Sequence, residues 1–215
     1  MGITAVILAG GAGRRMGGAD KGLVPLAGRA LISHVIDCIE PQVDELIISA
    51  RLNRGADRSA DRSADRRGYL DFGYPVIFDD VNDATQAPAG PLAGVAAGLA
   101  AAREALVLFA ACDMPALPQD LVSRLNAALD SAQAEIAVAV TGERVHPVVM
   151  LARRVERVDQ HLRAYMASGG RRADGWYAEL AVVRVDFGPA STAFANINTP
   201  DDLATHEARL AGRMP

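Results

Sequence analysis

The chain has 215 residues, of which 50% are hydrophobic and 22% are charged, and its 22 Lys and Arg against 26 Asp and Glu give a formal net charge of -4. This composition excludes an intrinsically disordered protein, and the mild acidity argues against a protein that coats nucleic acid. With 2 cysteines, no disulfide framework, no signal peptide and no apolar run near the roughly 20 residues of a membrane helix, we expect a cytoplasmic protein.

Apolar β-rich segments alternate with helical patterns along the chain. This alternation is typical of a mostly parallel sheet covered by helices, so we predict an α/β fold with three αβα layers and a Rossmann-like sheet. Thr199 is expected to cap the last helix, and Pro118 is expected in the first turn of the helix that contains Leu121. In chain order, we expect strands at 3–8, 46–48, 76–78, 106–111, 136–140, 148–151 and 181–185, and helices at 31–39, 92–102, 118–129, 155–166 and from 200 onward.

A repeated Ala-Asp-Arg-Ser segment interrupts this alternation between residues 55 and 67. It has no apolar side chain larger than alanine, and its opposite charges cancel locally. We interpret it as a low-complexity exposed loop at about 54–68 that joins two strands, with a frayed, exposed helix as the alternative. No second boundary is visible, so we predict a single domain over residues 1–215.

The most informative segment is the glycine-rich stretch that follows the first strand, from Gly10 to Gly22. A glycine-rich turn at the carboxyl end of a first parallel strand lies where open α/β sheets bind ligands. Glycines also let backbone N–H groups approach an anion closely. Arg14, Arg15 and Lys21 concentrate positive charge here in a chain that is acidic overall. We therefore interpret the stretch as a phosphate-binding loop rather than a solvated surface loop.

Three classes of phosphate loop can be compared with this stretch. A Walker A loop needs Gly-Lys followed by Ser or Thr, but Lys21 lies between Asp20 and Gly22. A dinucleotide fingerprint needs a third glycine where Met16 stands. The remaining class is a nucleotidyltransferase loop, in which a long Gly/Arg stretch wraps a triphosphate and ends in a lysine.

Two runs in this region carry a more specific signal, Leu8-Ala9-Gly10-Gly11 and Arg15-Met16-Gly17-Gly18-Ala19-Asp20-Lys21-Gly22. Later stretches agree in order: Gly90-Pro91-Leu92-Ala93-Gly94, Cys112-Asp113-Met114-Pro115, His146-Pro147 and Asn196-Ile197-Asn198-Thr199-Pro200. Together they resemble the molybdenum cofactor guanylyltransferases over nearly the whole chain. The resemblance implies a nucleotidyltransferase fold of the GT-A type that transfers GMP from GTP to the terminal phosphate of molybdopterin, forming the guanine dinucleotide cofactor and pyrophosphate.

The resemblance also implies roles for particular residues. Arg15 and Lys21 would contact the β- and γ-phosphates, and Asp113, placed after the most hydrophobic strand, would bind Mg²⁺. Magnesium commonly uses one or two carboxylates plus phosphates, so one aspartate is sufficient; a capping or turn aspartate is the alternative interpretation. The catalytic residues are then Arg15, Lys21 and Asp113, and the GTP-binding residues are Leu8, Ala9, Gly10, Gly11, Gly13, Arg15, Gly18, Lys21, Ser49, Asp79 and Asp113.

Some of these nucleotide contacts stay open. Ser49 stands where many relatives have asparagine, and its single hydroxyl offers fewer hydrogen bonds than an amide, so Asn53 is an alternative. A carboxylate after the third strand, either Asp79 or Asp80, would accept hydrogen bonds from guanine.

Molybdopterin binding is implied for a second group of residues. Gly90 and Gly94 flank the start of a helix, and we expect only one of Asn196 and Asn198 to face the site unless the backbone twists. The basic pair Arg171 and Arg172 either holds the molybdopterin phosphate or interacts favourably with the dipole at the C-terminus of the preceding helix. The full set is Gly90, Gly94, Arg171, Arg172, Asn196 and Asn198.

Other interpretations stay open. The rivals are a molybdopterin cytidylyltransferase, a sugar-phosphate nucleotidyltransferase and a non-catalytic nucleotide- or cofactor-binding protein. We interpret Cys112 as a small packed residue and His146 as structural or pocket-lining. The expected partners are GTP and the molybdenum cofactor, with transient contacts to other cofactor-biosynthesis proteins and recipient molybdoenzymes. We expect a monomer that binds neither nucleic acid nor membrane.

Overall fold

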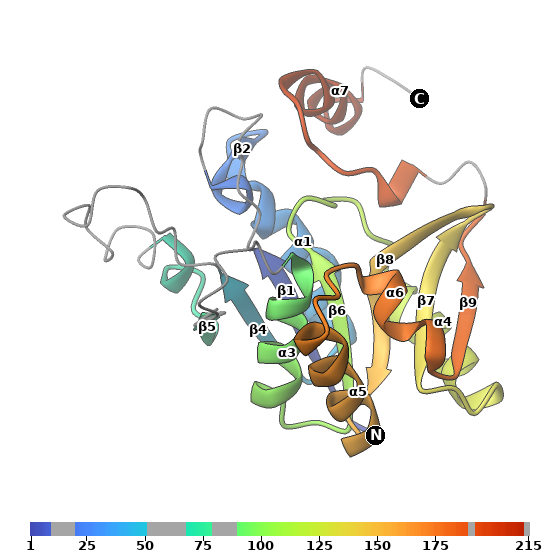
Figure 1. The fold of residues 1–215 in the computed structure, drawn as a ribbon. Coiled ribbons are helices and arrows are strands. Elements are labelled where there is room, and N and C mark those ends of the chain that lie inside the picture. Colours follow the sequence, from blue (N-terminus) through green and yellow to red (C-terminus); the bar gives the residue numbers. More distant parts are fainter. Residues whose placement is uncertain (10–19, 51–67, 79–89, 189–191, 213–215) are drawn as a thin grey trace.

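The computed structural model describes residues 1–9, 20–50, 68–78, 90–188 and 192–212. Its centre is a 7-stranded sheet in the order β5-β4-β1-β6-β8-β7-β9 (Figure 1). Of these strands, β8 runs antiparallel to its neighbours and the others run parallel, so the predicted mostly parallel sheet is confirmed. The strands are β1 (Ile3–Ala9), β4 (Glu45–Ala50), β5 (Val76–Phe78), β6 (Leu106–Ala111), β7 (Ile136–Thr141), β8 (Arg144–Arg153) and β9 (Val182–Asp186).

Helices cover both faces of the sheet, which gives the expected three layers (Figure 1). Ile7 of β1 packs in the apolar cluster that contains the buried side chains of α1 and α4, whereas Val6 packs in the cluster of α3, α5 and α6. Because neighbouring residues of a strand point to opposite faces, the continuous apolar run of β1 fills both cores. The helices are α1 (Leu31–Ile39), α3 (Pro91–Ala101), α4 (Leu121–Ser131), α5 (Glu156–Ala167), α6 (Ala173–Trp176) and α7 (Pro200–Leu210).

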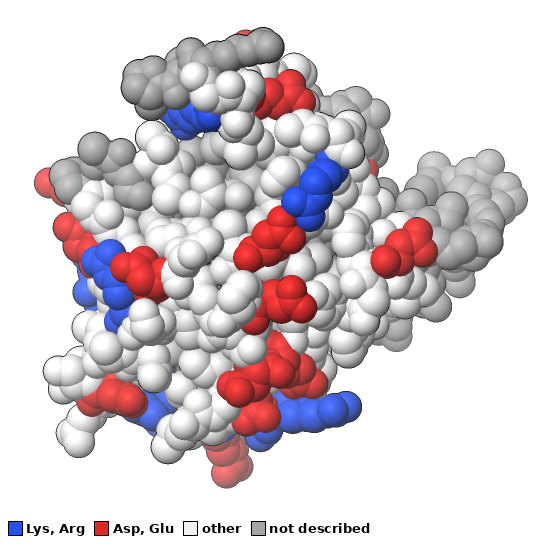
Figure 2. Space-filling view, turned by 180° about the vertical axis from the view of Figure 1, so that it is seen from behind, with Lys and Arg blue, Asp and Glu red and all other residues white. Residues whose placement is uncertain are grey.

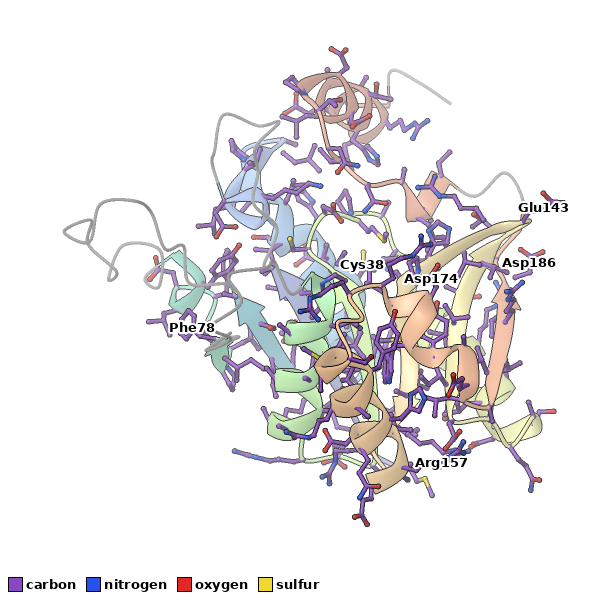
Figure 3. All side chains as sticks on the ribbon, in the orientation of Figure 1. Cys38, Phe78, Glu143, Arg157, Asp174 and Asp186 are labelled. Carbon is purple, nitrogen blue, oxygen red and sulfur yellow. The ribbon has the colours of Figure 1, made fainter. Side chains whose placement is uncertain are left out.

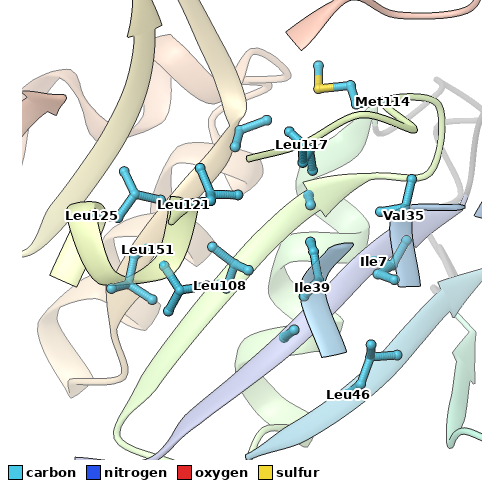
Figure 4. Packing of buried hydrophobic residues seen from close by; sticks show 14 of the residues in the cluster. Ile7, Val35, Ile39, Leu46, Leu108, Met114, Leu117, Leu121, Leu125 and Leu151 are labelled. Carbon is cyan, nitrogen blue, oxygen red and sulfur yellow. The ribbon is translucent and has the colours of Figure 1, made fainter. Parts of the chain in front are cut away.

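The larger core lies beneath α1 and α4. In Figure 4, Val35 and Ile39 of α1 approach the strands from the same side as Leu121 of α4, over Ile7 and Leu108. Each of these five side chains is fully buried. The apolar spacing that predicted α1 from the sequence is therefore the stripe that seats this helix on the sheet.

A small hairpin and the last helix lie beyond the sheet. The hairpin, which no pattern in the sequence predicts, is formed by β2 (Pro25–Leu26) and β3 (Arg29–Ala30). Helix α7, at the top of Figure 1, covers it through Leu203. As predicted, Thr199 caps α7: its side chain accepts the N–H of Asp202, whose carboxylate accepts the N–H of Thr199.

Two sequence expectations need correction. Helix α4 begins at Leu121 with Asp120 as its cap, so Pro118 lies in a turn before the helix rather than in its first turn. The Pro118 carbonyl accepts the Leu121 N–H at 3.2 Å, which closes that turn. The strand expected at 148–151 is longer, because β8 starts at Arg144 and pairs with β7 as a hairpin. The exposed loop expected at about 54–68 lies, except for Gly68, outside the described residues.

The charge on the surface is mixed. The back of the molecule shows Lys and Arg beside Asp and Glu, and its described residues form no continuous basic patch (Figure 2). Among the helices that the structure describes, none has the length and apolarity to cross a membrane.

Replacing Gly98 by alanine is expected to lower the free energy of unfolding by about 1–3 kcal/mol, because the site is already packed. A Cβ at this position would lie 2.9 Å from the Phe109 ring and 3.0 Å from both Val6 methyl groups. These side chains are fully buried and have little room to move. Urea unfolding measures the change. Helix propensity alone favours alanine over glycine by about 1 kcal/mol, so stabilisation of that size would contradict the prediction. Ala100→Gly, on the exposed face of α3, measures propensity alone.

Candidate active site

The candidate site lies where β1, β4 and β6 end. β1 pairs with β4 on one side and with β6 on the other, and Leu8 is in register with both Ser49 and Ala111. The connections from β1 and β6 thus diverge to opposite halves of the sheet. Such a switch in strand order, at the carboxyl edge of an open α/β sheet, opens the crevice in which these folds bind ligands.

An ion pair between Lys21 and Asp113 occupies this edge. Lys21 begins the short 3₁₀ helix η2 (Lys21–Leu23), and its Nζ contacts Oδ2 of Asp113 in a charge-assisted hydrogen bond. The same nitrogen donates to Oδ1 of Asn198 at 2.6 Å. The side chains of Lys21 and Asp113 are 13% and 10% exposed, so the pair is largely shielded from water.

Asn196 completes the cluster from the other side of Asp113. Its Nδ2 donates to Oδ1 of Asp113 at 3.0 Å, and the N–H of Ile197 donates to the Asp113 carbonyl at 3.0 Å. Both Asn196 and Asn198 reach the Lys21–Asp113 pair, in agreement with the resemblance, which implied both; only the expectation from strand alternation, that one would face the site unless the backbone twists, needs correction. Residues two apart in an extended segment share a face, so both asparagines reach the pair while Ile197 is buried.

The strand that carries Asp113 explains the position of that carboxylate. The N–H of Cys112 donates to the Leu8 carbonyl at 3.1 Å and so extends the pairing of β1 with β6 by one step. Asp113 then turns out of the sheet at its carboxyl edge. Burial raises the pKa of the Cys112 thiol, and the neighbouring Asp113 carboxylate adds to the effect. A buried, protonated thiol agrees with the interpretation of Cys112 as a packed residue.

Gly94 fixes how closely α3 approaches the strand ends. A Cβ at this position would lie 2.8 Å from Cδ2 of Leu8 and 3.0 Å from Oγ of Ser49. Ser49 is itself buried. The structure thus brings Leu8, Ser49 and Gly94 together and gives Gly94 a packing role in addition to the ligand contact predicted for it.

The predicted basic pair, Arg171 and Arg172, lies in a turn beside Gly90. Gly90 caps α3 with a φ of 63°, and a Cβ there would lie 3.0 Å from the Arg171 carbonyl oxygen. The Arg171 guanidinium donates to the carbonyls of Met166 and Gly170 at the end of α5, at 3.0 and 2.8 Å. Arg172 pairs with Asp174, which Figure 3 places toward the carboxyl edge of the sheet. The turn at Gly90 and the turn at Arg171 are therefore in close contact.

Ala9, the last residue of β1, is buried, and the other predicted site residues not yet placed lie outside the described ranges. They are Gly10, Gly11, Gly13, Arg15, Gly18 and Asp79, together with the alternatives Asn53 and Asp80.

The side chains around Lys21 Nζ fit a hard cation. Within the described ranges, no group of three or more His, Cys, Asp or Glu could hold a metal ion. However, Oδ2 of Asp113 and Oδ1 of Asn198 both contact one positively charged nitrogen, that of Lys21. Carboxylate and amide oxygens are the donors that Mg²⁺ takes from proteins, commonly with only one or two carboxylates.

Tyr69, which is not among the residues predicted from the sequence, also belongs to this site. Its hydroxyl donates to Oδ1 of Asp20, the residue before Lys21. Tyr69 follows the Ala-Asp-Arg-Ser repeat in a short run that also contains Phe72 and Tyr74, and this run is too short for a periodic pattern to indicate which ring is buried. Only Asp20, as part of a motif, gave a hint that a partner was needed.

His146 is structural. Its ring is buried and stacks on Phe194 with a centroid distance of 4.7 Å. Its Nε2 forms a hydrogen bond of 2.9 Å with Oγ1 of Thr141. Phe194 ends the 3₁₀ helix η5 (Thr192–Phe194), two residues before Asn196, so the stacking supports the segment that reaches Asp113.

Acidification is expected to destabilise the protein through His146. Burial, with the nearby Arg144, lowers the pKa of His146, so below pH of about 6.5 the unfolded chain binds a proton that the folded chain does not. The stabilisation is thus complete above that pH and is lost as the pH falls toward the folded pKa. Melting temperatures at pH 7.5 and 5.5 should differ more for the wild type than for His146→Gln, and equal differences would contradict this account. Burial also lowers the pKa of His206, but its effect on the melting temperature is the same in the wild type and in His146→Gln and cancels in the comparison.

Comparison with known proteins gives consistent results. The chain matches the MobA-like NTP transferase domain over residues 5–181. It is 43% identical over 212 residues to a protein of Shewanella sp. (strain ANA-3) named molybdenum cofactor guanylyltransferase, covering 99% of this chain and 96% of that protein. A protein of the same name from Shewanella loihica is 42% identical over 93% of this chain and 92% of that protein.

Solved structures share the fold. The molybdopterin-guanine dinucleotide biosynthesis protein A of Archaeoglobus fulgidus superimposes with a TM-score of 0.73 at 22% identity, covering 98% of this chain and 100% of that chain. The 2-C-methyl-D-erythritol 4-phosphate cytidylyltransferase of Thermus thermophilus gives 0.64 at 17% identity, covering 98% and 100%. Such distant likeness shows the nucleotidyltransferase fold alone.

Proposed function

The chain belongs to the MobA-like NTP transferase family, and from this premise we propose that it is a molybdenum cofactor guanylyltransferase. It would transfer GMP from GTP to the terminal phosphate of molybdopterin, giving the guanine dinucleotide cofactor and pyrophosphate. Identity of 43% with proteins of that name over nearly the full length supports the substrate pair. The observation that carries the chemistry is the cluster of Lys21, Asp113, Asn196 and Asn198 at the carboxyl edge.

The reaction needs positioning and charge neutralisation rather than a general base. A phosphate monoester has a second pKa of about 6, so the attacking molybdopterin phosphate is already mostly a dianion at neutral pH. One of its oxygens bonds to the α-phosphorus of GTP while the bond from that phosphorus to the bridging oxygen breaks and pyrophosphate leaves. The difficulty lies in bringing two anions together, which requires cations and oriented donors.

The described residues supply part of this arrangement. We propose that Lys21 carries positive charge to the β- and γ-phosphates, together with Arg15 and the glycine N–H groups of the loop after β1. Asn196 keeps the Asp113 carboxylate oriented through its hydrogen bond. Leu8, Ala9 and Ser49 would line the nucleotide, and Asp79 would accept from guanine. Gly90, Gly94, Arg171, Arg172, Asn196 and Asn198 remain the proposed molybdopterin contacts.

We also propose a requirement for Mg²⁺, held by Asp113 with the side-chain oxygen of Asn198. When bound, such an ion neutralises charge that develops on the phosphates. The described residues Lys21, Asn196 and Asn198 would hold and orient the groups that react.

Nucleotide selectivity tests the proposed function. Pyrophosphate release should be measured with molybdopterin and Mg²⁺ while GTP, CTP and ATP are offered in turn. We expect release with GTP and its loss when EDTA removes the metal. A strong preference for CTP would instead assign the chain to molybdopterin cytidylyltransferases. Tight GTP binding without release under any condition would favour a non-catalytic nucleotide-binding protein.

A further inference from the structure

We propose that Tyr69 is a positioning residue for Lys21, because its hydroxyl holds Asp20 and thereby fixes the turn from which the lysine reaches Asp113. The inference rests on the proposed function, since it assigns Tyr69 a part in presenting Lys21 to the triphosphate. Tyr69 itself touches neither substrate in this account.

The first support is a chain of hydrogen bonds. The Tyr69 hydroxyl donates to Oδ1 of Asp20, and the same carboxylate oxygen accepts the N–H of Gly22 at 3.3 Å. Asp20 is the N-cap of η2, whose first residue is Lys21. The same oxygen of Asp20 therefore binds the Tyr69 hydroxyl and the backbone N–H of Gly22, so the residues before and after Lys21 are both held.

The second support is that Tyr69 is anchored on the other half of the site. Its side chain is 1% exposed, and it belongs to the same apolar cluster as Cys112 and Met114, the two neighbours of Asp113. The ring therefore lies in the same core as the two neighbours of Asp113, while the hydroxyl holds the segment that carries Lys21. A single side chain thus connects the segments of both partners of the ion pair.

The third support is the close approach of two turns. A Cβ on Gly22 would lie 2.6 Å from Oη of Tyr69, and a Cβ on Gly68 would lie 2.6 Å from Cδ1 of Leu23. The turn at Gly22 therefore has a glycine where Tyr69 packs against it, and the turn at Gly68 has a glycine where Leu23 packs against it. Any larger residue at position 22 would push against the hydroxyl that contacts Asp20.

The hydroxyl is suited to hold a carboxylate but not to transfer a proton. Burial raises the pKa of Tyr69 far above its usual value, and the nearby Cys112 and Asp20 add to the effect. Tyr69 therefore stays protonated at neutral pH and remains a hydrogen-bond donor. This property separates a positioning role from general acid catalysis.

The test compares Tyr69→Phe with Tyr74→Phe in the full-length protein. Tyr74 donates a hydrogen bond to the exposed Glu40 at 2.6 Å. The Tyr74→Phe variant therefore loses a similar tyrosine–carboxylate hydrogen bond outside the site. For Tyr69→Phe, we expect kcat/KM for GTP to fall about tenfold, as for loss of a hydrogen bond to a charged group. KM for molybdopterin should stay unchanged, and Tyr74→Phe should match the wild type. A purely structural role would reduce the amount of folded enzyme without separating the two substrates.

A second pair of variants examines the route through Asp20. Asp20→Asn keeps an oxygen acceptor for the tyrosine and should retain more activity than Asp20→Ala. Adding Tyr69→Phe to Asp20→Ala should have almost no further effect, because the contact is already absent. If the two effects multiply instead, the inference is wrong.

The outcomes separate this inference from the proposed function. If the wild type transfers no GMP, the proposed function fails whatever Tyr69 does. If the wild type is active and Tyr69→Phe equals Tyr74→Phe, only the positioning role fails. If Tyr69→Phe does not fold, Gly22→Ala disturbs the same contact from the other side and should give the same split between substrates. Wild-type kinetics of a folded Gly22→Ala would overturn the role.

Discussion

Asp113→Asn is expected to lower kcat by about a hundredfold or more while the protein stays folded, as when a charged group acting on the transition state is lost. Asparagine has the same shape, so it can still accept a hydrogen bond and pack beside Cys112. It cannot supply the negative charge that faces Lys21 and the proposed Mg²⁺. The fall in kcat is therefore expected in protein that remains folded, although its melting temperature should also fall because Lys21 loses its counterion in a largely buried site. Steady-state pyrophosphate release with GTP and molybdopterin, together with a thermal melt, measures both.

A matched control is available in Asp130→Asn. Asp130 forms an exposed ion pair with Arg153 at 2.6 Å, and its side chain is 60% exposed. Exposed pairs contribute about 0–1 kcal/mol to stability, and this one belongs to α4 and β8, away from the cluster. Asp130→Asn should keep full turnover. A fully active Asp113→Asn would remove the carboxylate from the mechanism, and the metal site with it.

Lys21→Ala is expected to raise the Kd for GTP and lower kcat together, with a fall in kcat/KM of about a hundredfold, the size seen when one preorganised charge-stabilising donor is removed. The reason is electrostatic: the ammonium would face the triphosphate in a site largely shielded from water. Lys21→Arg should restore only part of the activity, because a planar guanidinium cannot replace a compact ammonium between Asp113 and Asn198. Equilibrium binding of GTP without molybdopterin separates the affinity from the turnover.

Arg29→Ala provides the control for this charge removal. Arg29 pairs with Asp37 at 2.7 Å on the surface, where both side chains are more than half exposed. Its loss removes the same formal charge and should leave GTP binding unchanged. Lys21→Ala with kinetics like those of Arg29→Ala would show that the lysine does not serve the nucleotide.

Much of the framework could be predicted from the sequence because local patterns determine it. The continuous apolarity of β1 and β6 predicted strands buried on both faces, and the helical spacing of α1 predicted the stripe that packs on them. Thr199 and Asp202 predicted the start of α7 through capping chemistry that acts within a few residues. These features need no knowledge of distant contacts.

The relations between distant residues could not be predicted in the same way. Lys21 and Asp113 are 92 positions apart and Lys21 and Asn198 are 177 apart, so only the resemblance to a family suggested that they meet. The direction of β8 and the hairpin of β2 and β3 depend on pairing rather than on periodicity. Nothing at position 69 itself indicated the role of Tyr69, because that role arises from the close packing of two turns.

The ion pair of Lys21 and Asp113 also bears on how substrate enters. Each charge already has its counterion within the protein, so a lone phosphate would have to take the lysine and strand the aspartate, and a lone divalent ion would do the reverse. Leaving one member of a largely buried pair uncompensated is costly. A metal–nucleotide complex carries both signs and can replace both partners in a single exchange. Under the proposed function, the resting site would therefore discriminate against free inorganic phosphate and favour co-entry of the two ligands.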